Sequence, residues 1–216
     1  MTRFTRLCCA SAVLAAISAP VFAGDITTEW AGVKSPPVPE LKPVTVDPKT
    51  TALLVLDFMK SNCGERPRCL ATIPNVKKLI DAARAQNVPV FYTMAGRDPT
   101  PAAMVDQGLA PRPNDFIVKG SAGAGDKFID SNLDQGLKEK GIRTVIVTGT
   151  SAQVAVGGTA NGAAQHGYKA VVPVDGMSSE DAYSEQYAAW HIYKGGSQVL
   201  RANATLTRSD LIKFGS

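Results

Sequence analysis

The chain has 216 residues and a mass of 22.7 kDa, which corresponds to one compact domain or two very small ones. Apolar residues make up 44% and charged residues 19%, so the chain can bury a sizeable core, and disorder is excluded. The net charge of +4 is too small and too dispersed for a nucleic-acid-binding surface, so nucleic acid is not an expected partner.

Residues 1–23 have the three parts of a secretory signal peptide. Two arginines form a basic region, the next stretch is almost continuously apolar, and small residues precede the bond between Ala23 and Gly24, where we expect cleavage. The apolar stretch is short for a membrane-spanning helix of about 20 residues and contains a proline, which disfavours an anchor. We therefore expect a periplasmic or secreted protein that has no membrane partner after cleavage.

The remaining sequence alternates between predicted strands and helices. Residues 24–48 are polar and rich in proline, which indicates an extended arm leading into a domain over 49–216. Apolar runs predict strands at 51–57, 88–93, 115–119, 144–148, 168–174 and 197–200. Helical spacing predicts helices at 73–85, 132–139, 153–166, 179–193 and 208–214. Such alternation is typical of a parallel sheet covered by helices on both faces, an α/β sandwich of three layers.

Two cysteines remain after signal cleavage, Cys63 and Cys69. They lie six positions apart around a turn that contains Gly and Pro, which in an oxidising compartment predicts a small disulfide loop. The alternative is a catalytic thiol, but that needs a histidine or a helix N-terminus nearby, and both histidines are remote in sequence. Two cysteines and two scattered histidines also lack the spacing of a zinc site, so we expect no metal.

Polar residues follow several of the predicted strands. Asp57 ends the first strand, Lys119 ends a middle strand, and a turn over 149–155 follows the strand at 144–148. Ligands of a parallel sheet bind at the carboxyl ends of its strands, near the point where the strand order reverses. We therefore expect these residues to lie at one edge of the sheet. A simpler role for Asp57, capping a helix, stays open.

Three motifs in this order resemble the isochorismatase-like hydrolases, also called the cysteine hydrolase superfamily. One strand ends in Leu-Val-Leu-Asp57 and another in Phe-Ile-Val-Lys119, and residues 147–159 form a strand–turn–helix segment, Val-Thr-Gly-Thr-Ser-Ala-Gln-Val-Ala-Val-Gly-Gly-Thr. The resemblance covers about residues 50–175. It implies a six-stranded, mostly parallel Rossmann-like sheet, a small-molecule substrate and often a homo-oligomer. Hydrolysis needs no metal or organic cofactor, and we expect none.

The family's nucleophilic cysteine corresponds to Ala155 in this chain. A methyl group cannot attack a carbonyl, so the Asp–Lys–Cys amidase mechanism is not available as written. Isochorismatases proper also have a small residue here, and they hydrolyse a vinyl ether without a covalent nucleophile. The resemblance makes Asp57 the acid that protonates the enol carbon, and Lys119 the group that binds a substrate carboxylate or stabilises the leaving oxygen. Burial favours a protonated Asp57, whereas a nearby Lys119 opposes it.

The resemblance also assigns substrate binding to the turn before Ala155. Backbone N–H groups at a helix start suit an oxyanion or a carboxylate, and Thr150, Ser151 and Gln153 are the expected substrate-binding residues. Isochorismatases have His where this chain has Gln153, so the substrate stays open. The first hypothesis is an exported hydrolase that acts without a thiol. The second is a catalytically lapsed member of the family that binds a small molecule.

Two further segments have simpler interpretations. The glycine-rich residues 120–127 resemble a phosphate loop but lack its Lys and Ser/Thr spacing, so we expect a loop beside the site. Tyr183, Tyr187, Trp190 and Tyr193 recur at helical spacing, which predicts a packing stripe or, as the alternative, a surface for a second copy of the chain.

Overall fold

The computed structural model describes residues 24–95, 99–121 and 123–215. The chain divides into two units, and the boundary along the sequence lies between Pro36 and Pro37. The predicted signal peptide lies outside the described residues. Among the helices of the described ranges, none combines the length and the apolar character needed to cross a membrane.

The first unit contains a short helix and a helical turn before Pro36. Helix α1 (Ile26–Glu29) is followed by η1 (Trp30–Gly32). The Asp25 carboxylate accepts a hydrogen bond from the Thr27 N–H at 2.9 Å and so satisfies a free donor at the start of α1. The start of the segment expected to be an extended arm is therefore helical.

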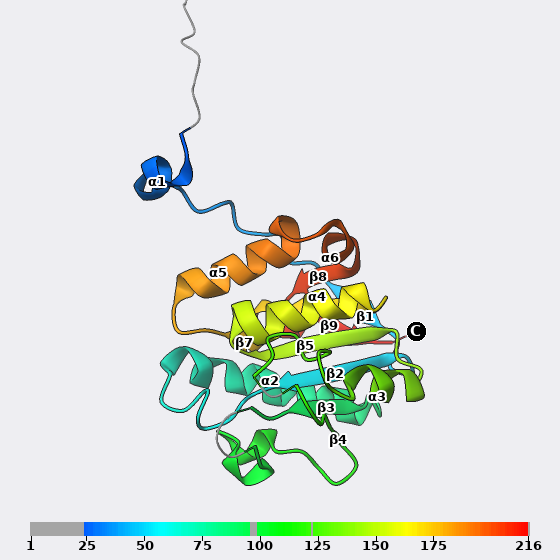
Figure 1. The fold of residues 1–216 in the computed structure, drawn as a ribbon. Coiled ribbons are helices and arrows are strands. Elements are labelled where there is room, and N and C mark those ends of the chain that lie inside the picture. Colours follow the sequence, from blue (N-terminus) through cyan, green and yellow to red (C-terminus); the bar gives the residue numbers. More distant parts are fainter. Residues whose placement is uncertain (1–23, 96–98, 122, 216) are drawn as a thin grey trace, which may run out of the picture. The chain divides into compact units, whose positions relative to one another are not determined.

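From Pro37 onward, the chain forms an α/β sandwich around a parallel sheet (Figure 1). The sheet has the strand order β4–β3–β2–β5–β6–β8, with β7 paired to β5, and each of these pairings is parallel. The strands are β2 (Thr51–Leu56), β3 (Val90–Thr93), β4 (Phe116–Ile117), β5 (Thr144–Thr150), β6 (Lys169–Pro173), β7 (Met177–Ser178) and β8 (Ala204–Thr207). A second ladder pairs β1 (Val44–Val46) with β9 (Ile212–Phe214). The predicted fold class is confirmed, but among the described residues the sheet has seven strands instead of six, because β7 pairs with β5 outside the main strand order.

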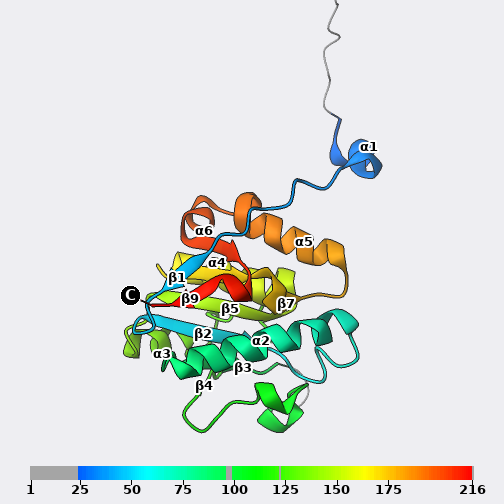
Figure 2. The ribbon, with the colours of Figure 1, turned by 180° about the vertical axis from the view of Figure 1, so that it is seen from behind.

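Helices cover both faces of the sheet (Figures 1 and 2). Helix α2 (Pro67–Ala85) packs on one face, together with the β1–β9 ladder. The opposite face carries α3 (Leu133–Glu139), α4 (Gly157–Gln165), α5 (Ala182–Trp190) and α6 (Gln198–Asn203). The helical turns between these elements are η2 (Pro101–Ala103), η3 (Gln107–Leu109), η4 (Ala152–Val156), η5 (Val174–Gly176), η6 (His191–Gly195) and η7 (Ser209–Leu211).

Strand β2 lies between β3 and β5, and all six of its residues are buried. Successive side chains of a strand point to opposite faces, so Leu54 and Leu56 join the core beneath α3 and α4, whereas Leu53 and Val55 join the core beneath α2. The continuous apolar run of the sequence therefore reflects burial on both faces, as predicted.

Strand order reverses between β2 and β5. The chain runs from β2 outward through β3 to β4, then returns to β5 and runs outward through β6 to β8. Leu56 pairs in register with Thr93 of β3 and with Gly149 of β5, so the three strands end side by side. This switch point is where doubly wound sheets bind their ligands.

The end of the chain differs from the sequence prediction. The strand expected at 197–200 is helix α6, because the Ser197 hydroxyl accepts a hydrogen bond from the Leu200 N–H at 3.1 Å and caps a helix start. The sheet strand is β8 instead. The helix expected at 208–214 is η7 followed by β9, which forms because its residues pair with β1 from the other end of the domain.

The aromatic stripe of α5 does not pack into the core. Tyr183, Tyr187 and Tyr193 are exposed, and the buried residues of this segment are alanines and Ile192. The interpretation as a packing stripe is therefore wrong for these tyrosines. A surface for a second copy of the chain stays a prediction.

Candidate functional site

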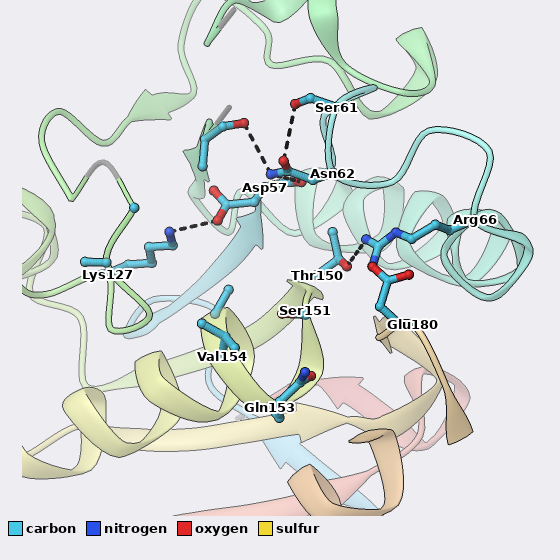
Figure 3. A pocket seen from close by; sticks show the side chains of 14 residues that line it. Asp57, Ser61, Asn62, Arg66, Lys127, Thr150, Ser151, Gln153, Val154 and Glu180 are labelled. Carbon is cyan, nitrogen blue, oxygen red and sulfur yellow. Dashed lines mark hydrogen bonds and ion pairs between the residues drawn. The ribbon is translucent and has the colours of Figure 1, made fainter. Parts of the chain in front are cut away.

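A pocket of about 370 Å³ opens at the carboxyl ends of β2 and β5 (Figure 3). Its walls come from five segments of the chain: the stretch from the end of β2 to the start of α2, the residues after β3, the loop before α3, the turn after β5 and the residues after β7. Most of the side chains drawn in Figure 3 are polar. The strand-end argument thus located this pocket correctly.

Asp57 lies immediately after β2, and its side chain is 6% exposed. Its φ of 58° is a left-handed conformation that few residues other than glycine adopt, and such outliers concentrate at functional sites. The Thr93 hydroxyl donates to Oδ1 at 2.7 Å, and the Lys127 ammonium lies 2.8 Å from Oδ2. Each carboxylate oxygen of Asp57 is thus contacted by a donor.

Lys127 is as deeply buried as its partner, with a side chain that is 3% exposed. Its backbone N–H donates to the Thr159 hydroxyl on α4 at 3.1 Å, and its carbonyl oxygen accepts from the Ser131 hydroxyl at 2.6 Å. These contacts hold the backbone while the ammonium reaches Asp57. Because an isolated buried charge is costly, each member of the pair depends on the other.

The expectation that Lys119 accompanies Asp57 is wrong. Lys119 is exposed and does not line the pocket, and its backbone exchanges hydrogen bonds with Asn132 at 2.7 and 3.2 Å. The physical reason is that β4 has only two residues, at the edge of the sheet, so the chain has already left the sheet at this position. Lys127 provides the ammonium from the following loop.

The glycine-rich loop over 120–127 lies beside the pocket, as its sequence predicted. Gly123 and Ala124 line the pocket together with Lys127. Helix α4 packs tightly on this loop, because a Cβ at Gly158 would come within 2.8 Å of the backbone of Gly125. The small residues of α4 therefore set the position of the loop that carries the lysine.

Partial burial also affects the neighbour of Lys127. Desolvation raises the pKa of the Asp126 carboxyl above its usual range, although its Oδ1 accepts a hydrogen bond from the Phe128 N–H at 2.9 Å. Asp126 lies outside the pocket lining, so it shapes the loop and does not face a ligand.

The turn after β5 forms another wall of the pocket. Thr150 ends β5, the peptide bond to Ser151 is cis, and η4 leads into α4. The Ala152 N–H donates to the Ser179 hydroxyl at 3.0 Å, and this hydroxyl donates in turn to the Gln153 side chain. The three residues predicted to bind substrate, Thr150, Ser151 and Gln153, line the pocket, and their binding role stays a prediction.

Ala155 lines the same pocket as Asp57 and Lys127. It belongs to η4 and is 3% exposed, so its methyl group is part of the wall. The structure therefore brings together Asp57 and the turn at Ala155, two of the three predicted strand-end features.

Arg66 is a pocket residue that the sequence analysis did not identify. The predicted disulfide joins Cys63 to Cys69, and Arg66 lies within the loop that it closes. Its Nη2 donates to the Thr150 hydroxyl at 2.6 Å, and its Nη1 lies 2.7 Å from the Glu180 carboxylate. The only signal in the sequence was an arginine between two cysteines predicted to pair.

Metal ligands do not gather in the described part of the chain. Among the described residues, no group of three or more His, Cys, Asp or Glu side chains is placed to hold a metal ion. His166 lies 3.4 Å from the Asp134 carboxylate and stacks on Phe128, outside the pocket lining.

The fold and the pocket define a class: a doubly wound α/β protein with a polar pocket at the switch point of its sheet. Residues 51–204 match the sequence model of the isochorismatase domain. Because the match spans well over half of the chain, the protein belongs to the isochorismatase family. Proteins similar to this chain include a ureidoacrylate amidohydrolase and an N-carbamoylsarcosine amidase.

Individual relatives are more distant. A secreted isochorismatase effector, Isc1, from Verticillium dahliae is 29% identical over 51% of this chain and 62% of its own length. An N-carbamoylsarcosine amidase from Arthrobacter is 32% identical over 47% of each chain. The chain thus spans less than two thirds of the length of either relative.

Solved structures share the fold. The crystal structure of a cysteine hydrolase from Pseudomonas syringae pv. phaseolicola superposes with a TM-score of 0.66 at 21% identity, covering 80% of this chain and 94% of that one. At this identity the likeness concerns the fold alone.

Proposed function

We propose that this protein is an exported hydrolase that cleaves a small molecule without a covalent enzyme intermediate. The observation that carries the proposal is the Asp57 carboxylate, which is buried between Thr93 and Lys127 yet lines a pocket whose wall presents the methyl group of Ala155. Such a site has a group that can transfer a proton and offers no thiol at position 155 to attack a carbonyl.

The reaction that we favour is hydrolysis of a vinyl ether. Asp57 donates its proton to the terminal enol carbon, which leaves an oxocarbenium ion and a carboxylate on Asp57. Water adds to the cation and returns a proton to Asp57. The resulting hemiketal passes its hydroxyl proton to the ether oxygen as the bond between the ketal carbon and that oxygen breaks. The products are a ketone, pyruvate when the ether carries an enolpyruvyl group, and the free alcohol.

Lys127 takes the role that the resemblance gave to Lys119. Its ammonium lies 2.8 Å from the Asp57 carboxylate and can also contact a carboxylate of the substrate. An anionic substrate then lies beside the group that transfers the proton.

Export is supported by two independent observations. The sequence of residues 1–23 has the pattern of a signal peptide, and the disulfide between Cys63 and Cys69 is of a kind that persists in oxidising compartments. The Verticillium relative is a secreted isochorismatase effector as well.

The second candidate function is small-molecule binding by a family member that has lost its chemistry. It is favoured by the ion pair itself, because Lys127 and Thr93 already occupy both carboxylate oxygens of Asp57. The two candidates share the pocket and differ only in turnover.

The test is pyruvate release from isochorismate by the protein from residue 24 onward, run in D₂O. We expect pyruvate carrying one deuterium in its methyl group, and loss of release in Asp57→Asn. Lys127→Met should also lose release, whereas Lys119→Met, which removes an equal charge outside the pocket, should match the wild type.

Four outcomes would contradict the proposal or part of it. Unlabelled pyruvate, or release that survives Asp57→Asn, would exclude Asp57 as the proton donor. No release by the wild type would exclude vinyl-ether hydrolysis of isochorismate and favour the binding protein. Equal losses in the Lys119 and Lys127 variants would remove the assigned role of Lys127.

A further inference from the structure

We propose that Arg66 binds a carboxylate of the substrate at the pocket wall opposite Lys127, and that Glu180 competes with the substrate for this guanidinium. The inference rests on the proposed function and deepens it, because it assigns a charge to the substrate and adds a residue for specificity. Arg66 and Lys127 approach the pocket from opposite sides in Figure 3.

The chain holds Arg66 at a defined point. The disulfide between Cys63 and Cys69 is fully buried and closes the loop on either side of it. Pro67 is the first residue of α2, and a residue that precedes proline is kept out of the helical region, so Arg66 is extended with φ −72° and ψ 112°. The disulfide and Pro67 therefore restrict the backbone conformation from which the Arg66 side chain extends.

The guanidinium retains binding capacity after its protein contacts are counted. Arginine has five N–H donors, and here Nη2 contacts Thr150 while Nη1 contacts Glu180. The Nε–H is buried and has no hydrogen-bond partner among the described residues. A planar guanidinium suits a carboxylate, with which it can form two parallel hydrogen bonds.

Glu180 is a replaceable partner. Its side chain is 72% exposed, against 21% for that of Arg66, and ion pairs with so exposed a member contribute little free energy. A ligand carboxylate bound in the pocket can take the place of Glu180 on Nη1. The Thr150 hydroxyl, which is buried, would continue to orient the guanidinium.

A second arginine–glutamate pair provides a matched control. Arg68 lies two residues further along and pairs with Glu185 of α5, with Nε 2.9 Å from Oε1. This pair ties the start of α2 to the segment after β7 in the same way, but neither of its members lines the pocket at Asp57. Changing Arg68 therefore removes an equal charge without removing the proposed binding group.

The experiment measures binding of chorismate, a dicarboxylate with an enolpyruvyl ether, by calorimetry at fixed ionic strength. We expect Arg66→Gln to weaken binding about tenfold, which corresponds to loss of one hydrogen-bonded charge pair, and Arg66→Lys to recover part of it. Arg68→Gln should bind as the wild type does. Glu180→Gln should bind about two- to fivefold tighter, because it removes the competitor.

Several results would overturn the inference. Wild-type affinity in Arg66→Gln, or an equal loss in Arg68→Gln, would show that Arg66 does not recognise the anion. Weaker binding by Glu180→Gln would make that residue a support for Arg66 instead of a competitor. Absence of saturable chorismate binding to both the wild type and Glu180→Gln would also reject the proposal.

Failure here can be distinguished from failure of the proposed function. Binding is measured with Asp57→Asn as well as with the wild type, so the readout does not depend on turnover. Binding that depends on Arg66 in a protein that releases no pyruvate would support this inference and reject hydrolysis. Turnover that is lost in Asp57→Asn but unchanged in Arg66→Gln would support hydrolysis and reject this inference.

Discussion

Two ion pairs line the pocket, and they differ chiefly in their exposure to water. The side chains of Asp57 and Lys127 are 6% and 3% exposed, whereas Glu180 in the pair with Arg66 is 72% exposed. Breaking the inner pair leaves a buried charge without an ion-pair partner, whereas Glu180 can return to solvent at little cost. The inner pair is thus suited to hold a proton-transferring group in place, and the outer pair is suited to exchange partners with a ligand.

The largest expected effect is on the inner pair. Lys127→Met leaves the Asp57 carboxylate buried and unpaired, so we expect the free energy of unfolding to fall by about 3–5 kcal/mol. Urea denaturation at neutral pH measures this change. The double variant Asp57→Asn/Lys127→Met should recover part of the loss, because it removes both charges. A loss below about 1 kcal/mol in the single variant would show that water reaches the pair.

The disulfide is next in size. Replacing Cys63 and Cys69 together by serine removes a short covalent loop, and we expect a stability loss of about 2 kcal/mol, measured by thermal or urea unfolding. The affinity for chorismate should fall at the same time, because the loop presents Arg66. An unchanged affinity for chorismate in the folded double variant would show that the disulfide is not needed to position Arg66.

The smallest expected effect is on the outer pair. Glu180→Gln should change the free energy of unfolding by less than about 0.5 kcal/mol, because its carboxylate is mostly in water. Urea denaturation beside Lys127→Met gives the direct comparison of the two pairs. A loss similar to that of Lys127→Met would contradict the difference on which their assigned roles depend.

Local pattern was sufficient for the first half of the fold. The run over 51–57 is apolar without interruption, and it forms β2, buried on both faces. Helix α2 begins earlier than the apolar spacing indicated, at Pro67, because a proline is well accommodated in the first turn of a helix. The assignments near the end of the chain were wrong because short apolar runs do not distinguish a strand from a helix.

The site was only partly predictable for a related reason. Asp57 and the turn at Ala155 follow long central strands, whose ends can be recognised in the sequence. Lys119 follows an apolar run that forms only a two-residue edge strand, so its position in the sequence did not determine its position in space. Lys127 was overlooked because it follows a loop with no regular pattern.

The sequence alone determined the α/β class and the central strand that leads to Asp57, and it predicted the pairing of Cys63 with Cys69 and the resemblance to the isochorismatase-like hydrolases. These features are encoded by neighbours within a few residues, through burial periodicity, turn residues and motif order. Only the tertiary structure decided that Lys127 reaches Asp57 and that Arg66 faces the same pocket. These contacts depend on how the loop packs against α4 and how the disulfide loop meets β5, and no local pattern specifies such packing between distant segments.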